Sequence, residues 1–134
     1  MSARKLGDSL ANLDKAVVNL EKALTLPIDQ ELVFEGTIHR FEIVAELMWK
    51  TLKRALEFEG LSPKTPRDSL KEAFRVGWLH EEATWLDMLD HRNTTSHASP
   101  ADELVAKNYA DIAVLTPKIR STLDFLKARY ARAE

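Results

Sequence analysis

The most constraining feature of this sequence is an apolar stripe with the period of an α-helix, which begins at Leu6. Leucines and one valine recur at alternating spacings of four and three residues: Leu6, Leu10, Leu13, Val17, Leu20 and Leu24. This spacing places all of these side chains on one face of a helix, whereas a half-buried strand would need alternation at every second residue. Because about three heptads are marginal for a free coiled coil, the stripe predicts a helix that packs in a bundle.

A second apolar stripe predicts a longer helix over about residues 29–59, which ends at Gly60 as a C-terminal cap. The residues of this stripe are Leu32, Ile38, Phe41, Val44, Ala45, Met48, Leu52 and Leu56. Glu46 and Lys50 lie among them, four apart, in the order that favours an ion pair. Two interpretations stay open for this pair: a solvated face, or a contact with the polar site described below.

A short third helix is predicted after the Gly60–Pro66 loop, because Thr65 is a good N-cap, Pro66 suits the first helical position and Asp68 the third. Its expected buried residues are Leu70, Ala73 and Phe74, and Gly77 is expected to end it. The opposite side is basic, with Lys64, Arg67, Lys71 and Arg75. Such a surface is usually only solvated, and it is also the best candidate in the chain for contacts with phosphates.

Two more helices complete the expected fold, one starting near Glu81 and one at Ser99–Pro100, with Pro117 kinking or dividing the latter. The last helix is expected to bury Leu104, Val105, Ile112, Leu115, Ile119, Leu123, Leu126 and Tyr130. No strand pattern and no internal repeat is present. The sequence therefore predicts an all-α, antiparallel up-and-down bundle of about five helices, similar to a four-helix bundle, with residues 1–134 as a single domain.

Composition excludes several classes of protein and of site. With 0 cysteines the chain has no disulfides and no thiolate chemistry, and no apolar run approaches the ~20 residues of a membrane span. No signal peptide is evident, so we expect a cytoplasmic protein without membrane contact. The net charge of −2 does not favour strong non-specific nucleic-acid binding. His80–Glu81 lacks the second histidine of a zinc helix, so neither a metal nor any other cofactor is expected.

The stretch from Trp85 to His97 departs from the amphipathic pattern. A strongly apolar helix runs into six residues, Arg92 to His97, that contain no apolar side chain and no Gly or Pro. If the helix continues in phase, Arg92 and Asn93 point where the apolar stripe pointed, toward a core or an interface. Arg92 and His97 are five apart and diverge by roughly 140° on an ideal helix. Either the helix ends or bends at Thr94–Thr95, or residues from two copies of the chain meet at a symmetric interface.

Arg92 and His97 are suited to cleaving RNA without a metal. His97 has an unperturbed pKa near neutrality and suits general acid or base chemistry, while Arg92 suits bidentate binding of a phosphate. Asn93, Thr95 and Ser96 are expected to position the phosphate or the catalytic pair. A second interpretation is a satisfied hydrogen-bond network that ties this end of the helix to a partner. The chain has no glycine-rich phosphate loop and no Asp-x-Asp pair, so it is not itself a nucleotidyltransferase.

Arg-Asn-Thr-Thr-Ser-His, residues 92–97, resembles the Arg, four to six residues, His motif of the HEPN superfamily, specifically its nucleotidyltransferase substrate-binding family. Residues 40–53, 62–74 and 85–89 agree with this family, so the resemblance covers nearly the whole chain. It implies a helical bundle that acts as a homodimeric endoribonuclease toxin, with Arg92 and His97 at the dimer interface. A separately encoded minimal nucleotidyltransferase would be its antitoxin. An alternative that the family name implies is a non-catalytic subunit, which binds a substrate or nucleotide for that partner.

Two residues beside the motif differ from the pattern of the family. Ser99 stands where many relatives carry the tyrosine that the partner nucleotidylates, and His91 stands where the residue before the arginine is usually acidic. Since Pro100 follows Ser99, we expect the Ser99 hydroxyl to cap the last helix and to be poorly placed for attack on a nucleotide. The partner is therefore expected to restrain this chain by binding over the site rather than by modifying Ser99.

Overall fold

The computed structural model describes residues 3–27, 31–87 and 103–131, and every regular element in these ranges is a helix. The long helices are α1 (Ala3–Ala23), α2 (Glu31–Phe58) and α5 (Glu103–Arg129). A shorter helix, α3 (Pro66–Arg75), follows α2, and residues 82–87 are also helical. The predicted all-α class is confirmed. None of the described helices is both long enough and apolar enough to cross a membrane.

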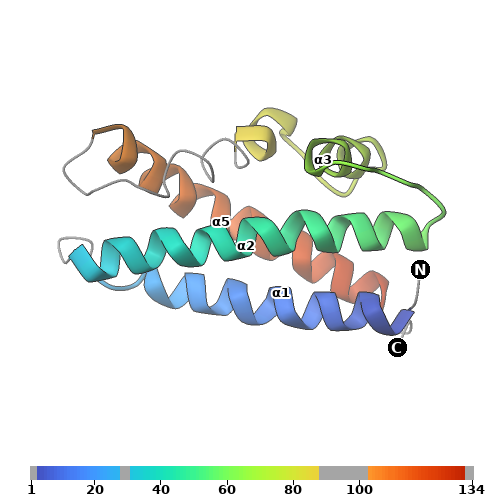
Figure 1. Ribbon diagram of the computed structural model, residues 1–134, viewed down its shortest axis with the longest axis horizontal. Coiled ribbons are helices and arrows are strands. Elements are labelled where there is room, and N and C mark those ends of the chain that lie inside the picture. The colour runs from blue at the N-terminus through green and yellow to red at the C-terminus, as the bar shows by residue number, and fades with distance from the viewer. Residues whose placement is uncertain (1–2, 28–30, 88–102, 132–134) are drawn as a thin grey trace.

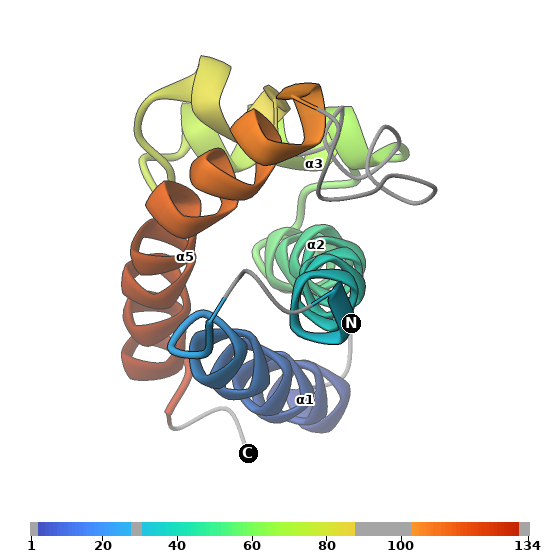
Figure 2. The ribbon, with the colours of Figure 1, turned by 90° about the vertical axis from the view of Figure 1, so that its left-hand side faces the viewer.

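The helices form an up-and-down bundle around one core. Helix α1 runs antiparallel to α2, and α5 runs in the same direction as α2, so α1 and α5 are antiparallel (Figure 1). Helix α1 packs on both α2 and α5, while α3 packs on α2. Residues 82–87 and α3 lie on the other side of α2 from α1 (Figure 2). This arrangement confirms the predicted bundle.

The stripe of α1 is buried as predicted, with Leu6, Leu13, Val17 and Leu20 at 0% exposure. In α2 the prediction is confirmed from Ile38 to Leu56, but it was wrong for one residue. Leu32 is 84% exposed, and Phe34 is buried in its place. The physical reason is helical phase, because two residues are about 200° apart and Leu32 therefore faces away from Phe34.

Two glycines end helices through the same hydrogen-bond pattern. At the end of α2, Leu61 N–H donates to the Leu56 carbonyl (2.9 Å) and Gly60 N–H to that of Glu57 (3.0 Å). Gly60 has φ +91°, a left-handed conformation that glycine adopts without a Cβ clash. The same pattern closes α3 at Gly77, whose φ is +88°. Both predicted ends are confirmed.

Helix α3 begins as predicted, because the Thr65 hydroxyl accepts a hydrogen bond from the Asp68 backbone N–H (3.0 Å). Its buried side differs from the prediction at one residue. Phe74 is 40% exposed, whereas Ser69 is fully buried beside Leu70 and Ala73. Ser69 tolerates burial because its hydroxyl donates to the Thr65 carbonyl (3.1 Å). The buried arc is thus centred on residues 69, 70 and 73, and Phe74 lies at its edge.

Pro117 bends α5 without dividing it. The helix is continuous through Pro117, and its two halves run in different directions (Figure 2). Proline removes one backbone donor and its ring crowds the carbonyl one turn earlier, which produces such a bend. The predicted burial of α5 is confirmed from Ile112 to Tyr130, while Leu104 and Val105 lie where side chains are not described.

Candidate functional site

Five of the predicted site residues lie outside the described residues, within 88–102: Arg92, Asn93, Thr95, Ser96 and His97. Ser99 lies there too. Their roles remain predictions. The structure does describe both flanks of this segment. Trp85, shortly before it, is 2% exposed and packs in the core, and after it Tyr109 stacks on Phe34 with ring centroids 5.4 Å apart. The motif therefore lies between two anchored helical segments.

The predicted pair of Glu46 and Lys50 forms on α2. Lys50 Nζ lies 3.3 Å from Glu46 Oε1, and the side chains of Lys50 and Glu46 are 46% and 42% exposed, respectively. Lys50 Nζ also lies 6.0 Å from the centroid of the Trp49 ring. The pair is thus a surface ion pair of the kind that contributes little to stability. Its predicted contact with Arg92 and His97 is not tested by the described residues.

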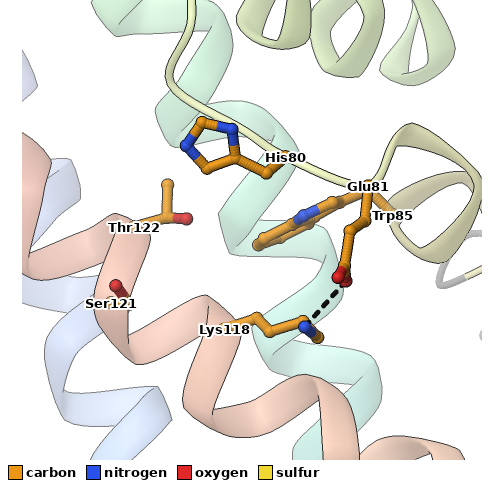
Figure 3. A pocket seen from close by; sticks show the side chains of 6 residues that line it. All are labelled: His80, Glu81, Trp85, Lys118, Ser121 and Thr122. Atoms are coloured by element: carbon orange, nitrogen blue, oxygen red, sulfur yellow. Dashed lines mark ion pairs between the residues drawn. The ribbon is translucent and has the colours of Figure 1, made fainter.

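A small pocket lies where the chain after α3 meets α5, and its floor is the indole of Trp85 (Figure 3). His80 and Glu81 line one side, and Lys118, Ser121 and Thr122 line the other from α5. Glu81 and Lys118 close one end with an ion pair of 2.7 Å (Figure 3). The volume of about 170 Å³ is below the ~300 Å³ at which ligand pockets begin, so it suits waters or one small group rather than a nucleoside.

Glu81 is the unusual residue of this pocket. Its φ of +59° makes it the one non-glycine residue with positive φ in the described chain, a conformation that costs on the order of 1 kcal/mol. The hydrogen bond from Lys118 lowers the pKa of the Glu81 carboxyl, and the charges of Lys118 and His80 act in the same direction. The sequence marked this glutamate as the approximate start of a helix and as part of an incomplete zinc motif, but not as a residue with positive φ. Among described residues no group of three or more His, Cys, Asp or Glu is arranged to hold a metal.

The basic side of α3 is exposed as predicted, at Lys64, Arg67, Lys71 and Arg75. Arg75 is held by Glu72, with Nη2 2.8 Å from Oε2. No ion pair joins the other three cations to any described residue, which leaves their charges available to a ligand. These three exposed cations remain the predicted candidates, among the described residues, for contacts with phosphates.

This chain is similar in sequence and in structure to several known proteins. A protein of Haemophilus influenzae named probable ribonuclease HepT is 33% identical over 90 residues, which are 63% of this chain and 61% of that relative's length. A solved structure from the same species, described as the substrate-binding domain of a nucleotidyltransferase, is 27% identical with a TM-score of 0.65. That match covers 94% of this chain and 99% of that structure.

A third similar structure supports the fold alone, because its sequence identity is only 13%. It comes from a tri-AMPylated Shewanella oneidensis HEPN toxin in complex with MNT antitoxin, with a TM-score of 0.72 over 92% of this chain and 96% of that one. The family model described as nucleotidyltransferase substrate binding protein like matches residues 8–128, nearly the whole chain. The protein therefore belongs to the nucleotidyltransferase substrate-binding protein family, as its motif predicts.

Proposed function

We propose that this chain is the HEPN subunit of a two-component pair, and that as a homodimer it cleaves RNA without metal at Arg92 and His97. The observation that carries the proposal is the spacing of Arg92 and His97 within a chain whose family match spans residues 8–128. The name of the Haemophilus influenzae relative, a probable ribonuclease, supports the same activity. A minimal nucleotidyltransferase is the proposed partner, by analogy with the toxin and MNT antitoxin complex.

The proposed reaction is a transesterification that needs only proton transfer and charge neutralisation. The RNA 2′-oxygen attacks phosphorus and forms a new P–O bond as the P–O5′ bond breaks, which yields a 2′,3′-cyclic phosphate and a 5′-hydroxyl. One His97 removes the proton from the 2′-hydroxyl, and His97 of the second protomer gives a proton to the leaving 5′-oxygen. Arg92 binds the phosphate through two N–H groups and stabilises the charge that develops on it.

The spacing of the motif supports a homodimer, which is one of the two arrangements that could bring Arg92 and His97 together. Arg92 and His97 diverge by roughly 140° on one ideal helix, and a two-fold axis brings Arg92 of one copy toward His97 of the other. Sedimentation equilibrium at micromolar concentration should therefore show a dimer. A monomer that cleaves RNA under the same conditions would contradict this part of the proposal.

The decisive experiment compares Arg92→Ala and His97→Ala with two matched controls, Arg4→Ala and His39→Ala. The controls remove an arginine and a histidine side chain at exposed positions of α1 and α2. We expect cleavage, measured on labelled RNA with EDTA present, to fall by at least about 100-fold in the motif variants and to persist in the controls. Thermal melting is the second readout, because activity lost with an unchanged midpoint supports catalysis. A midpoint that collapses on removing Arg92 or His97 would instead support a structural network.

A second candidate function is a non-catalytic subunit that binds a substrate or nucleotide for the partner enzyme. The family description and the Haemophilus influenzae substrate-binding domain favour it. Under this alternative, the purified chain cleaves no RNA but increases nucleotidyl transfer by its cognate minimal nucleotidyltransferase. Assays of both activities, with each protein alone and with the two together, separate the alternatives.

We also propose that the partner restrains this chain by binding over Arg92 and His97. Ser99 occupies the position where related sequences offer a tyrosine, and a capping hydroxyl is already engaged by backbone N–H groups. Intact-mass spectrometry after incubation with the partner, ATP and Mg²⁺ should show no AMP on Ser99. A mass increase of one AMP mapped to Ser99 would overturn this proposal, whereas modification at Tyr109 or Thr95 would move the chemistry to another residue.

A further inference from the structure

A larger cavity lies at the end of the bundle where α2 and α5 finish, beside the turn that follows α3. Its volume is about 340 Å³, within the ~300–1,000 Å³ range of ligand pockets and twice that of the pocket at Glu81. The residues that decide its chemistry are Glu59 and Leu61 after α2, Val76 and Trp78 after α3, and Phe125 and Arg129 on α5. The cavity thus combines one carboxylate and one guanidinium with apolar and aromatic walls.

The Glu59 carboxylate is fixed in one orientation and keeps one oxygen available. Its Oε1 accepts hydrogen bonds from Arg129 Nη2 (2.9 Å) and from the Tyr130 hydroxyl (2.9 Å). Its Oε2 has no hydrogen-bond partner among the described residues. The hydrogen bond from Arg129, and then that from Tyr130, lowers the pKa of the Glu59 carboxyl, so this group is ionised at neutral pH. An ionised, oriented oxygen at a cavity wall is a strong acceptor for N–H groups of a ligand.

The remaining walls favour a flat ligand. Phe125 is 45% exposed and Val76 is 37% exposed, although both are large apolar residues. The Arg129 guanidinium carbon lies 5.7 Å from the centroid of the Trp78 ring, which holds this planar cation at the edge of the cavity. Exposed aromatic rings and arginine planes are the surfaces on which proteins stack nucleobases.

We propose that this cavity binds a guanine base. Guanine presents two adjacent donors, N1–H and the N2 amino group, on one edge, and Glu59 offers an anionic acceptor for that edge while Phe125 supplies the stacking surface. Adenine and cytosine each offer only one donor group on the corresponding edge. Leu61 also lines the neighbouring cavity, where Lys71 lies with Asp68 and Glu72, so the proposal rests on recognition of the base and not on a phosphate contact.

The base comes either from RNA or from a free guanine nucleotide, and the binding does not require cleavage at Arg92 and His97. Titration calorimetry of the full chain carrying His97→Ala keeps binding separate from catalysis, so failure of one proposal leaves the other testable. The probes are GMP, IMP, AMP, and a short oligoadenylate with and without a single G. We expect GMP to bind about tenfold more tightly than IMP, which lacks the N2 amino group, and AMP to bind weakest.

Two variants test the assigned residues, each with a control of the same chemistry outside the cavity. Glu59→Gln should weaken GMP binding by about tenfold or more, while Glu57→Gln should not. Phe125→Ala should weaken it by at least about fivefold, whereas Phe74→Ala, equally an exposed phenylalanine, should have no effect. Because Phe125 is exposed, its removal tests the cavity even if Glu59→Gln lowers the melting midpoint.

The outcomes of the titration identify the source of the base or contradict the proposal. Tighter binding of the G-containing oligonucleotide than of GMP identifies RNA as the source of the base, and equal binding identifies a free nucleotide. Equal affinity for GMP, IMP and AMP would overturn the proposal. So would the absence of binding at millimolar GMP and with either oligonucleotide, or GMP binding that survives both Glu59→Gln and Phe125→Ala.

Discussion

Helix α1 is held to the rest of the bundle by two kinds of contact. Its apolar face, which includes Leu13 and Leu20 at 0% exposure, is part of the continuous core. Its polar edge meets α5 through charges: Arg120 lies 2.7 Å from Asp14 and 3.0 Å from Glu21, and Lys127 lies 3.0 Å from Asp14. The apolar contact removes surface from water, whereas the charged contact joins partly exposed groups that water also solvates.

Different residues of α1 therefore provide its stability and its alignment against α5. Burial is non-directional and contributes most of the folding free energy. The ion pairs are directional, and Arg120 has a defined place because its guanidinium bridges Asp14 and Glu21, which are two helical turns apart on α1. We therefore expect apolar truncations to have large effects on stability and charge removals to have small, pH-dependent ones.

The largest effect is expected from Leu13→Ala. Removing a fully buried leucine side chain loses its burial and leaves a cavity, so the free energy of unfolding should fall by about 3–4 kcal/mol. Leu32→Ala is the matched control, because Leu32 is 84% exposed and its truncation should change stability by less than about 0.5 kcal/mol. Urea denaturation followed by circular dichroism measures both. Equally large effects would contradict the exposure of Leu32 on α2, and equally small effects would contradict the burial of Leu13 on α1.

Arg120→Met should have an intermediate effect. Methionine keeps much of the aliphatic stem while removing three carboxylate contacts, to Asp14, Glu21 and Asp124, so we expect a loss of about 1–2 kcal/mol. Arg67→Met, at an exposed arginine without an ion pair among the described residues, should change stability by less than about 0.5 kcal/mol. A loss as large as that of Leu13→Ala would remove the distinction between the two contacts of α1.

A smaller, pH-dependent effect is expected from Asp14→Asn. Hydrogen bonds from Arg120, and next from Lys127, lower the folded-state pKa of Asp14 below its ordinary value of 3.8. The ionised carboxylate therefore stabilises the fold above about pH 4, and this contribution is lost as the pH falls through the lowered pKa. We expect wild type to exceed Asp14→Asn by about 1 kcal/mol at pH 7, and the two to converge as the pH falls below the lowered pKa of Asp14. The same comparison with Asp8→Asn, at an exposed position on α1, should show little difference at either pH.

The sequence predicted the parts of the fold that depend on local pattern. The stripe of α1, the capping of α3 by Thr65 and the helix ends at Gly60 and Gly77 all follow from spacing and from single-residue preferences. The errors at Leu32 and Phe74 occurred near helix ends, where few neighbours fix the phase of the buried face. Arg120 was not predicted as a bridge, because its partners on α1 are 99 and 106 residues away and no local pattern pairs them.

The candidate sites also differ in whether a local sequence pattern reveals them. The motif at Arg92 and His97 was recognisable as a short pattern, and the ion pair of Glu46 and Lys50 follows from their spacing of four residues. The cavity at Glu59 was not predictable, because Glu59, Val76 and Phe125 come from three separate segments that only the packed bundle brings together. The positive φ at Glu81 could not be predicted from the sequence either, since glutamate carries no preference for a left-handed conformation.

The smallest effect is expected at Glu81, where backbone strain and one ion pair act on the same residue. Glu81→Gln removes the charge that pairs with Lys118 but keeps a Cβ at φ +59°, whereas Glu81→Gly removes both. We expect the glycine variant to be more stable than the glutamine variant by about 0.5–1 kcal/mol, because the relief of strain exceeds the added freedom of the unfolded chain. At Glu82, which is helical, the same two substitutions should show the opposite order, since glycine destabilises a helix. Equal melting midpoints for the two Glu81 variants would show that the left-handed backbone there stores no energy, and that the ion pair with Lys118 alone distinguishes this residue.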